Sequence, residues 1–117
     1  MGDSILNSVK KIIGIDAADT SFDIDIIMHI NSVLNALTQL GVGPEEGFSI
    51  TDATSKWEDF LEDSVKLELV KSYVALKVRK IFDPPQSATA MEAINSVINE
   101  LEWRVGITVD HWDGLEV

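Results

Sequence analysis

The chain has 117 residues, of which 45% are hydrophobic, and its 20 acidic and 9 basic side chains give a formal net charge of -11. This length is typical of one domain, and the hydrophobic content is too high for a disordered chain. The acidic balance argues against binding to DNA, RNA or an anionic membrane, because phosphate contacts need clustered Lys and Arg. The absence of cysteine excludes a disulfide scaffold, a thiolate metal site and a Cys nucleophile.

The first predicted helix spans about residues 4–13. Asp3 or Ser4 can cap it by accepting a backbone N–H of the first turn, and Gly14 ends it because glycine adopts the left-handed conformation at low cost. Its apolar residues recur at helical spacing, which predicts one buried face. These residues are Ile5, Leu6, Val9, Ile12 and Ile13.

The second predicted helix spans about residues 24–40, with Asp23 as its cap and Gly41 as its end. Three-and-four spacing again predicts one apolar face, and His29 lies at the edge of that face. The apolar face consists of Ile26, Ile27, Ile30, Val33, Leu34, Leu37 and Leu40.

An irregular segment follows at residues 41–56, where glycine and proline interrupt regular structure. Residues 48–51 are expected to form a short extended piece. A brief helix over about residues 56–61 would place three apolar side chains together, and these are Trp57, Phe60 and Leu61.

The third long helix spans about residues 64–82 and ends before Asp83, which precedes two prolines. It is apolar almost all the way round, so it is expected to lie at the centre of the domain or to be covered partly by another subunit. One stripe consists of Val65, Leu69, Tyr73 and Leu76, and the other of Leu67, Val70, Val74, Val78 and Ile81.

A last helix over about residues 89–105 is capped by Ser87 or Thr89 and ended by Gly106. Its stripe contains Ala90, Ile94, Val97, Ile98, Leu101 and Val105. The predicted fold is therefore all-α: a compact bundle of about four helices with an irregular loop between helices two and three. Residues 1–107 form the helical domain, and residues 108–117 form a short C-terminal tail that is expected to bind a partner.

No catalytic, cofactor-binding or metal-binding set is predicted. The two histidines, His29 and His111, lack the Glu-x-x-His pairing of a di-metal bundle site. Gly43 is followed by Pro44, Glu45 and Glu46 rather than by the Gly-Lys-Ser/Thr of a phosphate loop. The acidic cluster is interpreted as a solvated face, although paired carboxylates can also bind a divalent cation. Its members are Glu58, Asp59, Glu62 and Asp63.

Several large apolar side chains do not fit a solvated monomer. Ile24 and Met28 project from the side of the second helix opposite its stripe, and Trp103 points away from the stripe of the last helix. Such groups together favour an interface, although Trp103 could instead cover the loop of its own subunit. The candidate subunit-interface residues are Ile24, Met28, Phe48, Ile50, Trp57 and Trp103.

The order of local sequence features supports a family resemblance. The segments that carry it are residues 22–31 (FDIDIIMHIN), 39–44 (QLGVGP), Trp57, 71–79 (KSYVALKVR), 83–85 (DPP) and 101–104 (LEWR). With these features, residues 3–107 resemble the small head–tail connector (adaptor) proteins of tailed bacteriophages and prophages of Gram-positive bacteria. Some members of that family are described as DNA-packaging proteins.

The resemblance implies a non-enzymatic structural protein of the virion neck, assembled in the host bacterial cytoplasm and without a cofactor or membrane contact. Around a dozen copies would form a ring below the portal, and DNA would pass through this ring without specific binding. The ring would contact the portal protein and a stopper or tail-completion protein. By position, the portal-binding candidates are Trp112, Leu115 and Val117.

Two other classes of function remain open at this stage. A small acidic helical regulator could mask a basic site on a partner protein, but such a mimic should display its carboxylates in regular rows, and here they are scattered. An enzyme would need a pocket with perturbed titratable groups, and two isolated histidines without a cysteine supply few such groups.

Overall fold

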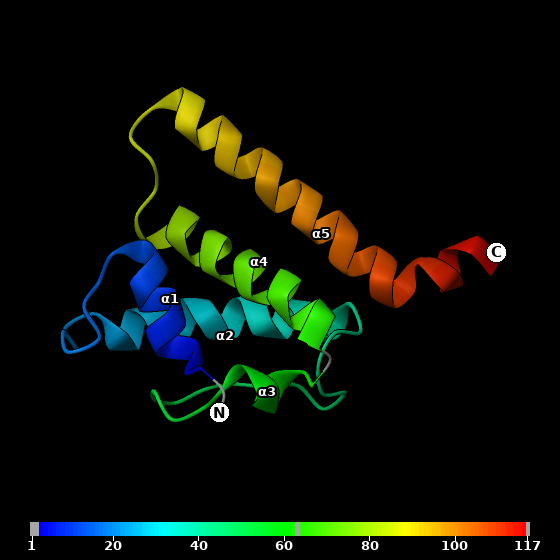
Figure 1. The fold of residues 1–117 in the computed structure, drawn as a ribbon, viewed down its shortest axis with the longest axis horizontal. Helices are drawn as coiled ribbons and strands as arrows, with labels where there is room; N and C mark the ends of the chain where they lie inside the picture. Colours follow the sequence, from blue (N-terminus) through cyan, green and yellow to red (C-terminus); the bar gives the residue numbers. More distant parts are fainter. Residues whose placement is uncertain (1–2, 63, 117) are drawn as a thin grey trace.

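The computed structural model describes the backbone of residues 3–62 and 64–116, and the side chains of residues 3–62 and 65–105. Its helices are α1 (Ile5–Ile13), α2 (Asp23–Gln39), α3 (Trp57–Phe60), α4 (Ser64–Phe82) and α5 (Ala88–Glu116). The described part of the chain contains no β-strand, so the predicted all-α fold is confirmed (Figure 1). Within the described residues, no helix is both long enough and apolar enough to cross a membrane.

Helix α4 forms the centre of the bundle, as its sequence predicts. It packs against α1, α2, α3 and α5, and it lies between α5 and α2 (Figure 1). Six of its side chains are buried: Leu67, Val70, Tyr73, Val74, Ala75 and Val78. At its ends, Val65 and Ile81 are 75% and 53% exposed within the single chain, so the second alternative, partial cover by another subunit, stays a prediction for these two positions.

The ends of α1 follow the sequence prediction, whereas the start of α2 does not. The Ser4 hydroxyl accepts the N–H of Asn7 at 3.2 Å, and Gly14 ends α1 with a φ of 87°. Phe22, rather than Asp23, occupies the cap position of α2, and it makes no side-chain cap hydrogen bond. Asp23 lies inside the helix because its carboxylate is engaged elsewhere, by a buried lysine.

The apolar faces of both helices are buried except at their ends. Ile12 of α1 and Leu40 after α2 are 50% and 41% exposed, so their predicted burial is wrong. The other predicted residues of the second stripe are buried apart from Ile27, which is half-buried.

The irregular loop between α2 and α4 is held by polar contacts. The Asn31 side chain acts like a neighbouring strand, because its Nδ2 donates to the Ile50 carbonyl at 3.0 Å while its Oδ1 accepts the Ile50 N–H at 2.7 Å. Residues 3–5 pair with residues 55–57 through two backbone hydrogen bonds of 3.0 and 3.2 Å. The expected extended piece is therefore anchored by a helix side chain rather than by a sheet.

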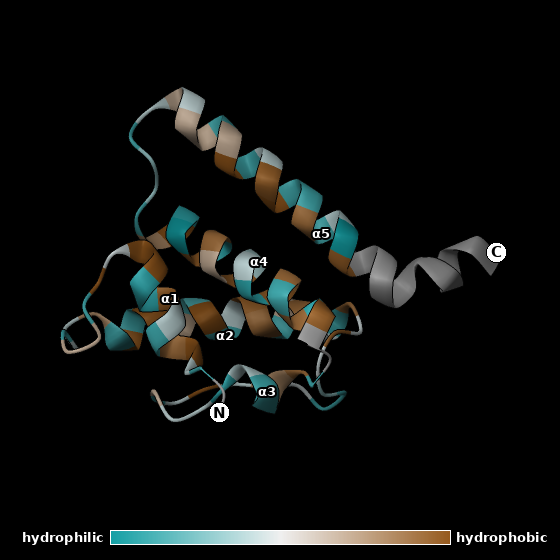
Figure 2. Ribbon diagram, in the orientation of Figure 1, coloured by the Kyte–Doolittle hydropathy of each residue, from teal (hydrophilic) through white to brown (hydrophobic). Residues whose placement is uncertain are grey.

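Helix α5 packs along one side of α4. Ser87 caps it, because the Ser87 Oγ accepts the N–H of Ala90 at 3.0 Å. Apolar and polar residues alternate along the helix, as packing on one side requires (Figure 2). The predicted end at Gly106 is wrong, since α5 continues to Glu116. One glycine inside a helix costs only about 1 kcal/mol relative to alanine, which does not suffice to stop it.

Candidate subunit interface

Three of the predicted interface residues lie on the surface. Ile24 and Met28 are 81% and 57% exposed on the first turns of α2, and Trp103 is 66% exposed on α5. The opposite sides of these helices are buried, through Ile26 and Ile30 in α2 and Ile98 and Val105 in α5. Trp103 therefore does not cover the loop of its own subunit.

The other three interface candidates contribute to the core of their own subunit. Ile50 and Trp57 are 1% and 0% exposed, and Phe48 is half-buried with its ring 5.4 Å from that of Phe60. A buried side chain cannot contact a neighbour while the loop stays folded, so Ile50 and Trp57 are corrected to core residues. Sequence reasoning missed this because the loop lacks helical periodicity.

Charge-free stretches of sequence include Met28 and precede Trp103, although Asp25 follows Ile24 and Glu102 precedes Trp103 directly. Residues 26–44 contain no Asp, Glu, Lys or Arg, and neither do residues 93–99. Further along α5, Glu100 pairs with Arg104 at 2.6 Å. In a chain of net charge -11, such stretches are notable, since the centres of protein interfaces are depleted of charge.

A buried lysine binds the segment that precedes Ile24 in the sequence. The Lys10 side chain is 1% exposed, and its Nζ lies 2.8 Å from the Asp23 carboxylate. The same ammonium donates to the carbonyls of Ala17 at 3.1 Å and Asp19 at 2.7 Å. This clasp ties α1 to the first turn of α2. The sequence signal was the position of Lys10 on the buried side of α1, between Leu6 and Ile13.

Helix α5 is fixed on α4 by a polar contact beside Trp103. The Tyr73 hydroxyl donates to the Glu102 carboxylate at 2.9 Å. Burial and the adjacent Glu102 carboxylate raise the pKa of Tyr73 to about 12 from its ordinary value of 10.0. The contact joins α5 to α4 one residue before Trp103, whose side chain is exposed.

This pKa predicts a pH dependence. Folding favours the neutral phenol, so the contribution of Tyr73 to stability is present below pH 10 and is lost as the pH rises from about 10 to 12. Tyr73 is the only tyrosine of the chain, so ultraviolet absorbance of the phenolate reports its titration directly. The free energy of unfolding of Tyr73→Phe is expected to lack the part of the decrease between about pH 10 and 12 that comes from ionisation of Tyr73. An ordinary titration midpoint near 10 in the folded protein would contradict the contact.

The remaining polar features of the described residues form no metal-binding group. Half-buried His29 belongs to no metal-binding group, because the described residues place no three His, Asp or Glu side chains together. Within the acidic cluster, Asp59 accepts the backbone N–H of Lys56 at 2.9 Å, while Glu58 and Glu62 are solvated; Asp63 lies outside the described residues.

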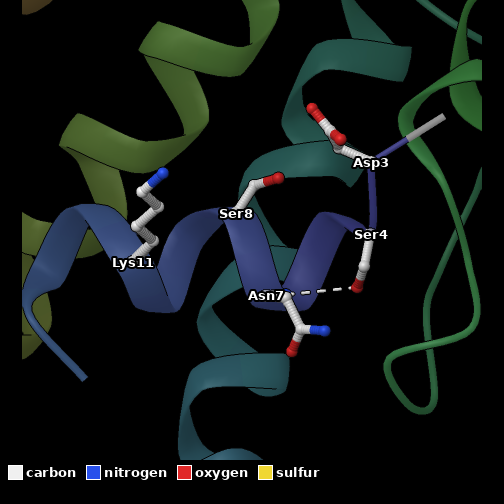
Figure 3. A pocket seen from close by; sticks show the side chains of 5 residues that line it. All are labelled: Asp3, Ser4, Asn7, Ser8 and Lys11. Carbon is white, nitrogen blue, oxygen red and sulfur yellow. Dashed lines mark hydrogen bonds between the residues drawn. The ribbon is translucent and has the colours of Figure 1, made fainter. Parts of the chain in front are cut away.

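A shallow polar hollow of about 360 Å³ runs beside α1 (Figure 3). Of its five lining side chains, Ser4 is already engaged as the cap of α1. The lining residues are Asp3, Ser4, Asn7, Ser8 and Lys11. This set offers two hydroxyls, one amide, one carboxylate and one ammonium group.

The geometry thus describes an all-α domain with large apolar side chains exposed on α2 and α5. A family model described as phage connector protein matches residues 5–111. The chain belongs to this phage head–tail connector family, which is a family of structural virion proteins rather than of enzymes. No curated protein and no solved structure matches the chain. The family match favours a connector over an acidic regulator. The origin from a phage of Gram-positive bacteria stays a prediction.

Proposed function

We propose that the chain forms an oligomeric ring below the portal, extends the DNA channel and joins the capsid to the tail. The observation that carries this proposal is the connector-family match over residues 5–111. The acidic charge supports it, because a surface of net charge -11 lets DNA pass without adhering. The ring would be a virion neck component that contacts the portal and a stopper or tail-completion protein.

The proposed subunit contacts use Ile24, Met28 and Trp103, whose side chains are exposed. The proposed portal contact uses the tail. Its candidates Trp112, Leu115 and Val117 lie outside the residues whose side chains the structure describes. The tail is continuous with α5 up to Glu116, so it would reach the portal as a helical extension of the bundle.

Native mass spectrometry of the chain, alone and mixed with its cognate portal protein, tests the function. We expect a closed ring of around a dozen copies in at least one of the two samples. Deleting residues 108–117 leaves the described contacts between α4 and α5 in place, so portal binding should be lost while the helical circular dichroism per residue stays nearly normal. Monomers in both samples would contradict the ring, and undiminished portal binding by the shortened chain would contradict the role of the tail.

A further inference from the structure

We propose that each copy docks head to tail on the next, with the α2 flank of one copy against the α5 flank of its neighbour. The α2 flank is defined by Ile24, Met28 and Ser32, and the α5 flank by Ser96 and Trp103; all five side chains are exposed. This inference rests on the proposed function and names the contact that would close the ring.

The two flanks belong to helices on opposite sides of α4, which packs against both α2 and α5 (Figure 1). A two-fold dimer pairs a surface with itself and would bury one flank while the other stayed exposed. A heterologous contact buries both flanks of every copy, and its repetition produces a ring.

The charge pattern points to another copy of this chain as the occupant. Two copies with a net charge of -11 repel each other unless they meet through charge-poor surfaces. Residues 26–44 and 93–99 provide such surfaces, and the adjacent Glu100 is neutralised by Arg104. A basic partner would instead select an acidic surface, such as that of Glu58 and Glu62.

The side chains of the two flanks differ in chemistry. Trp103 is a large rigid side chain of the type that dominates interface energetics. Met28 and Ile24 lie one helical turn apart and offer an adaptable apolar surface for the indole ring of Trp103. The two flanks are therefore complementary in chemistry: one presents an aromatic anchor, and the other presents an aliphatic surface that can accommodate it.

Cysteine cross-linking tests the contact without changing these apolar anchors. The chain contains no cysteine, and Ser32→Cys and Ser96→Cys are small changes at exposed positions. The full-length variants are treated with a short bis-maleimide, separately and as an equimolar mixture, at high protein concentration and again with the cognate portal. Thr54→Cys, which is exposed but outside both flanks, measures random collision.

We expect the mixture to yield about tenfold more cross-linked dimer than either variant alone or the Thr54→Cys control. Adding Trp103→Ala to the Ser96→Cys variant should lower this yield about tenfold, which corresponds to about 1.4 kcal/mol. Absence of the mixed product, or preferential linking within one variant, overturns the head-to-tail contact. If rings are still seen by native mass spectrometry, only this inference fails; if no oligomer forms with or without portal, the proposed function fails as well.

Discussion

Asp23→Ala is expected to lower the free energy of unfolding by about 3–5 kcal/mol, because it leaves the charge of Lys10 buried without its carboxylate. The Lys10 ammonium is 1% exposed and lies 2.8 Å from Asp23. Only the carbonyls of Ala17 and Asp19 would then remain as its hydrogen-bond acceptors. Urea unfolding monitored by circular dichroism measures the effect as a lower midpoint with an unchanged slope.

The matched control removes both charges. Lys10→Met with Asp23→Ala should be more stable than Asp23→Ala alone, since a methionine fills the lysine site without a buried charge. A third variant, Asp25→Ala, changes an exposed acid two residues away and should alter stability by no more than about 0.5 kcal/mol. Equal destabilisation by Asp23→Ala and Asp25→Ala would show that the clasp contributes little.

Gly43→Ala is expected to destabilise the protein by about 2–4 kcal/mol, from backbone strain and steric overlap together. Gly43 has a φ of 91°, and an added Cβ would lie 2.5 Å from the Cε1 atom of Phe60. The Phe60 ring is 2% exposed and packs edge-on against Phe48, so it has little room to move. Thermal or urea unfolding measures the loss of stability.

Gly14→Ala separates the two causes. Gly14 has a similar φ of 87°, but an added Cβ would meet no atom within 4 Å. Its substitution should therefore cost only the backbone strain, about 1–2 kcal/mol. If both alanine variants lose the same stability, the Phe60 ring moves aside and the close approach at Gly43 is unimportant.

Long periodic helices were predictable from the sequence, because each pattern satisfies a local rule. The bounds of α4 agree with the prediction at both ends. Its C-terminal end is set locally, because the two prolines after Asp83 stop the helix wherever it packs. The Ser4 cap and the Gly14 end of α1 are likewise local. Gly106 shows the limit of such rules, because a single glycine discourages a helix without ending it.

Site residues were predictable where a helix wheel decides exposure. Ile24, Met28 and Trp103 lie opposite a continuous apolar stripe, and all three are exposed. Ile50 and Trp57 lie in and beside the irregular loop, where no period distinguishes an inward from an outward side chain. Asn31 holds the Ile50 backbone from a helix 19 residues away in sequence, and the Trp57 N–H donates to the Asp3 carbonyl at 3.2 Å.

The all-α class, the acidic balance and the resemblance to phage connectors follow from the sequence alone, which left the position of α4 between two alternatives. Packing shows that Asp23 neutralises Lys10 rather than capping α2, and that Tyr73 joins α4 to α5 through Glu102. The difference arises from distance along the chain. Caps, stripes and breakers act within a few residues, whereas ion pairs and loop contacts form between segments that only packing brings together.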